Sequence, residues 1–156
     1  MTEPDLRVER IEPERLHDLR RRVLRGGDPE SRVSDPRDDE PTTIHFAGLI
    51  DESVVVSATF YSSTPLFDDA LIAYQLRYMA TDFHVQGRGY GATVLEFAQS
   101  HLRTLGAGQL WANGRDSALG FYRAMGWRVV EGSAHLSEET RLAHHVIYRY
   151  LSSERT

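Results

Sequence analysis

The sequence predicts a mixed α/β fold in which the first strands of the sheet are antiparallel. Residues 43–50 alternate in hydrophobicity, and residues 54–61 are rich in β-branched and aromatic side chains, as strands are. Residues 51–53, Asp-Glu-Ser, separate the two runs as a turn and so favour a hairpin. A third strand-like run, residues 71–81, leads into three closely spaced glycines and an amphipathic helix, residues 86–105. Helices and strands then alternate, which is typical of a mixed α/β domain.

The remaining elements follow from breaks in the same patterns. Residues 6–11 form a first strand, Pro13 suits the first turn of a helix, and Gly26–Gly27 end that helix. Gly106 follows the end of the helix that the glycines open. The other expected elements are a strand at residues 109–112, a turn at Asn113–Gly114, a helix capped by Asp116 and ended by Gly126, strands at 127–130 and 143–151, and a polar connection at 131–141.

Composition narrows the class of protein. A chain of 156 residues with 40% hydrophobic and 26% charged residues is expected to fold as one domain, residues 1–156. The net charge of −5 argues against binding to nucleic acid or to an anionic membrane. The chain has no Cys, and therefore no disulfide and no thiolate metal site. A charged N-terminus and the lack of a long apolar run favour a cytoplasmic location.

The three glycines Gly87, Gly89 and Gly91 predict an anion site. Glycine allows sharp turns and close approach to a ligand, and free N–H groups at a helix start attract phosphate. Residues 87–92 fit G-x-G-x-x-A, the dinucleotide-binding pattern. The context argues against that interpretation, because three strands precede the turn and the next strand ends in Asn113 instead of an acid.

Beginning at Gln86, the same residues have the pattern Q-x-x-G-x-G, which resembles the acetyl-CoA motif of the GCN5-related N-acetyltransferase (GNAT) superfamily. The resemblance spans residues 71–130. It includes a second motif at residues 117–127, SALGFYRAMGW, which is similar to a later helix of that superfamily. The resemblance implies a single GNAT domain. Its sheet would be mixed and mostly antiparallel, with six to seven strands flanked by helices, and splayed between the fourth and fifth strands.

The resemblance also implies an activity: the transfer of an acetyl group from acetyl-CoA to a primary amine of a small molecule or peptide. Acetyl-CoA would be the cosubstrate, and no metal would be needed. Met79 N–H would bind the thioester oxygen, and Tyr122 would protonate the leaving thiolate. A packed core residue is the alternative role for Tyr122. A homodimer is compatible with the resemblance. The implied cofactor-binding residues are Met79, Ala80, Thr81, Gln86, Gly87, Arg88, Gly89, Tyr90, Gly91, Ala92, Asn113 and Tyr122.

Two positions depart from the superfamily pattern. Gln75 occupies the position of a Glu that serves as general base in some members, and an amide cannot take a proton at neutral pH. Arg115 occupies a position that is often Asn, while Asn113 lies two residues earlier, either as a ligand to the cofactor or as a turn residue. The titratable alternatives for the base are His45, Asp82, His84, His144 and His145.

Three questions stay open at this stage. Residues 28–41 form an acidic, proline-containing loop, which is either a lid whose acids attract an amine or simply a solvated loop. Because the Glu is missing, a second class of function is also compatible with the sequence: a CoA-binding sensor or partner module without turnover. A nicotinamide-dependent enzyme is a third interpretation, which the context of the glycines disfavours.

Overall fold

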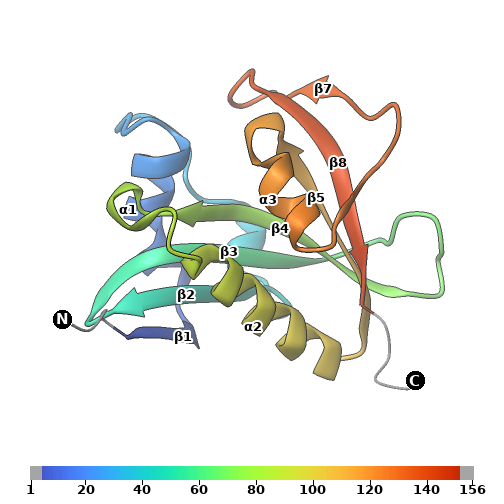
Figure 1. Cartoon of the computed structure of the whole chain (residues 1–156), viewed down its shortest axis with the longest axis horizontal. Coiled ribbons are helices and arrows are strands. Elements are labelled where there is room, and N and C mark those ends of the chain that lie inside the picture. Colours follow the sequence, from blue (N-terminus) through green and yellow to red (C-terminus); the bar gives the residue numbers. More distant parts are fainter. Residues whose placement is uncertain (1–4, 152–156) are drawn as a thin grey trace. The chain divides into compact units, whose positions relative to one another are not determined.

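The computed structural model describes residues 5–151 and shows a mixed sheet with helices against it (Figure 1). A helical segment follows β1, with the short α1 between turns of other helical type, Pro13–Leu16 and Arg20–Leu24, and a separate helical turn, Pro36–Asp39, precedes the hairpin. The elements are β1 (Leu6–Arg10), α1 (His17–Leu19), β2 (Ile44–Ile50), β3 (Ser53–Ser63), β4 (Ile72–Thr81), α2 (Tyr90–Thr104), β5 (Ala107–Arg115), α3 (Leu119–Ala124), β6 (Arg128–Val129), β7 (His135–Leu136) and β8 (Ala143–Tyr150).

The chain divides into two compact units. Among the described residues, unit 1 combines 5–61 with Arg77–His101, and unit 2 combines Ser62–Leu76 with 102–151. Both units contain part of β4. The strand order is β1-β2-β3-β4-β5-β8-β6, and β7 also pairs with β8. The β4–β5 pair is parallel, whereas the pairs β1–β2, β2–β3, β5–β8, β6–β8 and β7–β8 are antiparallel, so the expected mixed, mostly antiparallel sheet is confirmed. Its eighth strand, β7, lies inside the connection that was expected to have none.

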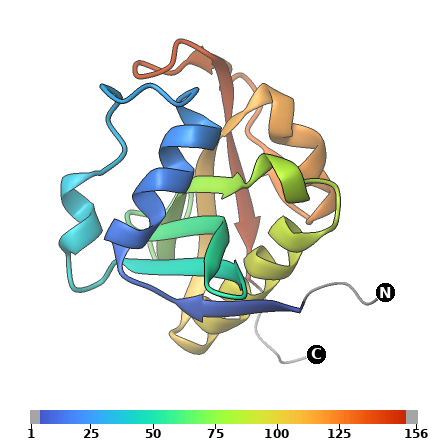
Figure 2. The ribbon, with the colours of Figure 1, turned by 90° about the vertical axis from the view of Figure 1, so that its left-hand side faces the viewer.

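In unit 1, α1 and α2 lie on opposite faces of the strands (Figure 2). Alternation along β2 explains this arrangement, because neighbouring residues of a strand point to opposite faces. The Phe46 ring meets Phe97 and His101 of α2, with ring centroids 6.0 Å and 5.7 Å away. Its neighbour Ala47 instead packs in a buried cluster with Leu16, just before α1.

Unit 2 corrects two local predictions. Asn113–Gly114 is part of β5, which pairs with β8 from Gln109 to Arg115, and is therefore not a turn. A Cβ on Gly114 would lie 2.8 Å from the Ile147 side chain, so a glycine fits here by close packing. Asp116 caps no helix with its side chain; its carboxylate instead lies 2.7 Å from Nδ1 of His145.

No helix within residues 5–151 is both long and apolar enough to cross a membrane.

Candidate functional site

The glycine turn opens α2 as the sequence predicts. Gly87 and Gly89 have φ angles of +83° and +81°, in the left-handed region that favours glycine. An added Cβ at either position would meet nothing within 4 Å, so the turn faces open space. Gln86 Nε2 donates to the Thr81 carbonyl at 3.0 Å and so joins the turn to the end of β4. A 15-residue helix begins directly at this turn, and the N–H groups in the first turn of a helix can bind an anion.

The strand that leads into this turn has an unusual backbone angle and loses its parallel partner before it ends. Tyr78 has a φ of +59°, a conformation that costs a non-glycine residue about 1–3 kcal/mol. The register between β4 and β5 ends at Leu76 and Ala112, although β4 runs on to Thr81 and β5 to Arg115. The expected splay between these strands is therefore confirmed. The backbone of Met79 to Thr81 consequently has no β5 partner in this ladder, and buried backbone groups require one.

A buried polar cluster holds the loop of residues 28–41 in unit 1. The Arg20 guanidinium, which is fully buried, donates to Asp38 Oδ2 at 2.9 Å, Thr59 Oγ1 at 2.8 Å and the Val33 carbonyl at 2.8 Å. Tyr61 donates its hydroxyl to the other oxygen of Asp38 at 2.5 Å. Burial alone would raise the pKa of Asp38, but the hydrogen bonds from Arg20 and Tyr61 outweigh it and lower that pKa. Asp38 accordingly holds the loop against the buried core of unit 1.

His45 belongs to the same cluster and cannot serve as a base. Its Nε2 lies 2.9 Å from the Asp38 carbonyl oxygen, which only accepts, so Nε2 carries the proton. Its Nδ1 lies 2.8 Å from Thr59 Oγ1 and accepts from that hydroxyl in the neutral ring. Burial lowers the pKa of His45, which keeps the ring neutral. Both nitrogens are thus engaged within the core.

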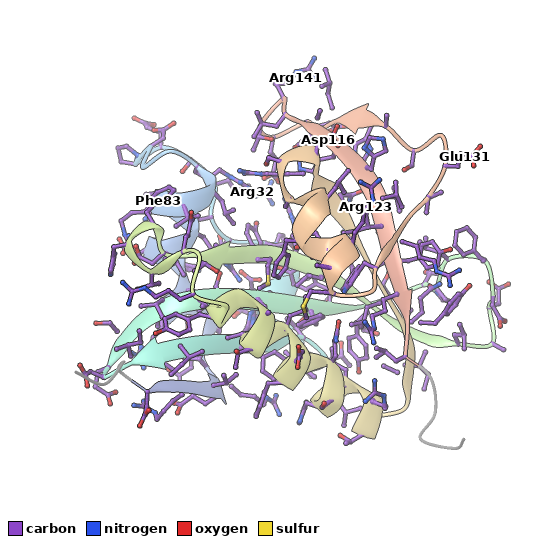
Figure 3. All side chains as sticks on the ribbon, viewed as in Figure 1. Arg32, Phe83, Asp116, Arg123, Glu131 and Arg141 are labelled. Carbon is purple, nitrogen blue, oxygen red and sulfur yellow. The ribbon has the colours of Figure 1, made fainter. Side chains whose placement is uncertain are left out.

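The two candidate bases near the turn, Asp82 and His84, also have partners. Asp82 accepts two hydrogen bonds from Arg22, at 3.2 Å and 3.0 Å, and its Oδ1 lies 2.9 Å from Nδ1 of His84. Burial alone would raise the pKa of Asp82, but the contact with Arg22 outweighs it. The pKa of Asp82 is therefore lowered, which makes the carboxylate a weaker base. Figure 3 shows the neighbouring Phe83 at this turn between β4 and α2, where it is 60% exposed.

A further cluster surrounds Asp35, which caps the short helical turn Pro36–Asp39. Arg37 donates to both oxygens of Asp35 from its backbone N–H and its guanidinium, and Arg77 of β4 donates to Oδ2 at 2.8 Å. Burial opposes ionisation of Asp35, yet these contacts lower its pKa to about 2.

In unit 2, Tyr122 lies in an aromatic setting on α3. The Tyr122 ring is 5.1 Å from Phe121 and 5.3 Å from Trp127 between centroids, and the residue is buried. Burial raises the pKa of Tyr122, so the phenol stays protonated at neutral pH. Asn113 is exposed on β5, opposite Val146 of β8. Gln75, buried at 9% exposure, faces Trp111 in the parallel ladder.

The two remaining histidine candidates lie next to each other on β8. Nδ1 of His144 lies 2.8 Å from the Leu142 carbonyl, and burial lowers the pKa of this ring. His145 is paired with Asp116, which Figure 3 shows at the start of the α3 segment.

Met79 to Ala92 therefore form one continuous segment of unit 1, whereas Asn113 and Tyr122 belong to unit 2. Sequence reasoning missed Tyr78 and the Arg20 cluster, because their geometry depends on residues far along the chain. Only Asp35 has a role that nearby residues indicate, because Asp35 and Asp38 form a capping box at the start of the helical turn Pro36–Asp39. Within the described part of the chain, no group of three or more His, Cys, Asp or Glu could hold a metal ion.

Comparison with known proteins agrees with this geometry. A curated relative, the uncharacterized N-acetyltransferase YitI of Bacillus subtilis, is 29% identical over 124 residues, which cover 79% of this chain and 83% of YitI. An IAA acetyltransferase from Bacillus cereus has the same fold with a TM-score of 0.72 at 17% identity, covering 94% of this chain and all of that one. An aminoglycoside 6'-N-acetyltransferase complexed with coenzyme A has a TM-score of 0.74 at 8% identity, covering 96% and 99%.

The model of the acetyltransferase (GNAT) family matches residues 13–127, most of the chain. This stretch includes the splayed strand, the glycine turn, α2 and Tyr122. The chain is a member of the GNAT family of N-acetyltransferases.

Proposed function

We propose that residues 1–156 act as a single GNAT domain that transfers an acetyl group from acetyl-CoA to the primary amine of a small molecule or peptide. The observation that carries the proposal is the glycine turn. The turn opens a long helix directly after a strand whose ladder with β5 has ended. A helix start suited to phosphate and strand backbone without a β5 partner in that ladder therefore follow each other along one segment.

The donor would lie along that segment. The N–H groups of Arg88 to Ala92 bind the pyrophosphate, while Gln86 and Gly87 shape the turn. The backbone from Met79 to Thr81 pairs with the amides of the pantetheine arm as an added strand would. The resemblance to the family implies that Asn113 of β5 and Tyr122 of α3 also contact the donor. Acetyl-CoA supplies the activated acetyl group, and the chain supplies its orientation.

The two catalytic groups have distinct tasks. The N–H of Met79 donates to the thioester oxygen as negative charge develops there, a contribution often worth about 3–4 kcal/mol. Tyr122 gives its proton to the thiolate that leaves. An apolar environment raises the pKa of the CoA thiol as it raises the pKa of the Tyr122 phenol. The departing thiolate is therefore a stronger base here than in water and can take the proton of Tyr122.

The amine must be neutral when it attacks. Gln75 cannot take its proton, and His45 has both nitrogens engaged. The amine therefore loses its proton to water or to another group, or it binds in its neutral form.

Replacing Tyr122 by Phe tests the proposal. The Tyr122→Phe variant is expected to release thiol from acetyl-CoA about 10²- to 10⁴-fold more slowly, with little change in acetyl-CoA affinity. An unchanged rate would remove Tyr122 as the acid. Acetyl-CoA, and not NAD, is expected to raise the melting temperature of the wild-type protein; the reverse result would favour a nicotinamide-dependent enzyme.

A further inference from the structure

The hairpin formed by β7 and β8 in unit 2 brings two histidine rings together. His135 of β7 is the direct partner of His144 in the antiparallel register, and their ring centroids lie 5.8 Å apart with planes inclined by 31°. Figure 1 shows β7 alongside β8. Directly paired residues point to the same face of a sheet, so both rings belong to one face of this hairpin. The next residue, His145, points to the other face, where it meets Asp116.

Hydrogen bonds orient both rings in the same way. Nδ1 of His135 lies 2.8 Å from the Ser133 carbonyl oxygen, and Nδ1 of His144 lies 2.8 Å from that of Leu142. A carbonyl oxygen only accepts, so in each neutral ring Nδ1 carries the proton and Nε2 has a lone pair. Histidines that bind metal ions almost always donate their other N–H to a carbonyl or carboxylate in this way, which fixes the ring and makes the binding nitrogen more basic.

Both Nε2 atoms are available to a ligand. Within residues 5–151, neither accepts a hydrogen bond. His135 is exposed, and the Nε2 of His144 is not fully enclosed, although that residue is only 8% exposed. Burial lowers the pKa of His144, so this ring keeps its lone pair at neutral pH. The charges of Arg115 and Asp116 act on His144 in opposite directions.

We propose that His135 and His144 form a two-histidine site for a divalent transition-metal ion such as Zn²⁺, which clamps β7 to β8. Imidazole nitrogen is a preferred ligand of Zn²⁺. Two bonds of about 2.0–2.1 Å, with the width of the rings added, correspond to centroids about 5–6 Å apart. The observed separation lies in that range. Water completes the coordination, because a permanent structural site has more protein ligands than two. The inference does not rest on the proposed function, which gives a metal ion no role.

A bound ion would stabilise a short hairpin. β7 contributes only two residues, His135–Leu136, to its ladder with β8. The loop between the strands is closed by the N–H of Ser137, which donates to the Leu142 carbonyl at 2.9 Å, and by that of Arg141, which donates to the Ser137 carbonyl at 2.8 Å. An ion that binds only the folded hairpin makes its opening less frequent, so hydrogen exchange of these amides should slow when Zn²⁺ is added.

Calorimetric titration of the full chain, without a polyhistidine tag, tests the site. We expect one Zn²⁺ per chain and no comparable binding of Mg²⁺, which prefers oxygen ligands. Loss of the partner behind a histidine ligand typically weakens metal binding about 10- to 100-fold, and His135→Gln removes the ligand itself, so it should weaken Zn²⁺ binding at least as much. The matched control is His17→Gln, a half-buried histidine of unit 1, which should leave the affinity unaltered.

Nuclear magnetic resonance locates the ion in the unaltered protein. The ring protons of His135 and His144 should shift together as Zn²⁺ is added, and those of His17 should not. This measurement decides the question even if His135→Gln loses the β7 hairpin, although replacing an exposed residue should change the melting temperature little. Binding weaker than about 1 mM, unaltered binding in His135→Gln, or shifts confined to other histidines would overturn the inference.

Discussion

Removing the Asp38 carboxylate should destabilise the protein strongly, although Asp38 lies in an acidic loop. The Asp38→Ala variant removes the acceptor of the Arg20 guanidinium, of the Tyr61 hydroxyl and of the Asp35 N–H. The side chain of Arg20 is fully buried, and that of Asp38 is 3% exposed, so water cannot replace the lost contacts without rearrangement of the core.

The magnitude follows from these contacts. Leaving one partner of a buried ion pair uncompensated costs about 3–5 kcal/mol. For a chain of this length each kcal/mol shifts the melting temperature by about 2–4 °C, so we expect a decrease on the order of 10 °C.

Urea unfolding followed by circular dichroism measures the loss. The matched control is Asp39→Ala, one residue along the same turn, where the side chain is exposed and a change below about 0.5 kcal/mol is expected. A loss for Asp38→Ala as small as that of Asp39→Ala would refute the view that this loop is held by a buried ion pair.

Other predictions concern the turn and acid stability. Gly89→Asp should weaken CoA binding about 10- to 100-fold through backbone strain and charge, whereas Gly132→Asp, at a similar φ of +77°, should leave binding intact in calorimetry. Similar losses in both would point to strain alone. The pKa of Asp35 is lowered from 3.8 to about 2, so its stabilisation is complete above about pH 4 and is lost as pH falls to 2. Asp35→Asn should flatten the acid limb of the unfolding free energy against pH, and an unaltered limb would contradict this assignment. His45, whose pKa is lowered by burial, contributes stability that is present above pH 6.5 and declines below it; His45→Gln should remove that part of the slope.

Local chemistry explains which parts of the fold could be predicted. Alternating hydrophobicity and turn residues predict the hairpin of β2 and β3, and the glycines predict the start of α2. These signals act over only a few residues. The superfamily resemblance added the splay between β4 and β5, which the register confirms.

The predictions that were wrong depend on partners far along the chain. Asn113–Gly114 has turn-forming residues, but pairing with β8 overrides that preference and Ile147 fills the space beside the glycine. The acids of residues 28–41 could not be recognised as structural, because Asp35 meets Arg77 from 42 residues away. The left-handed Tyr78 likewise follows from tertiary packing, since nothing in its own sequence neighbourhood calls for a positive φ.

The central claim is that this chain transfers the acetyl group and does not merely bind its carrier. The most direct measurement incubates the protein with acetyl-CoA bearing an isotopically labelled acetyl group and a broad panel of amines, followed by mass spectrometry of the amines and titration of free thiol. We predict a labelled amide that forms in step with CoA and that is strongly reduced with Tyr122→Phe. Tight binding of acetyl-CoA with only background hydrolysis across the panel would contradict the account and favour a sensor.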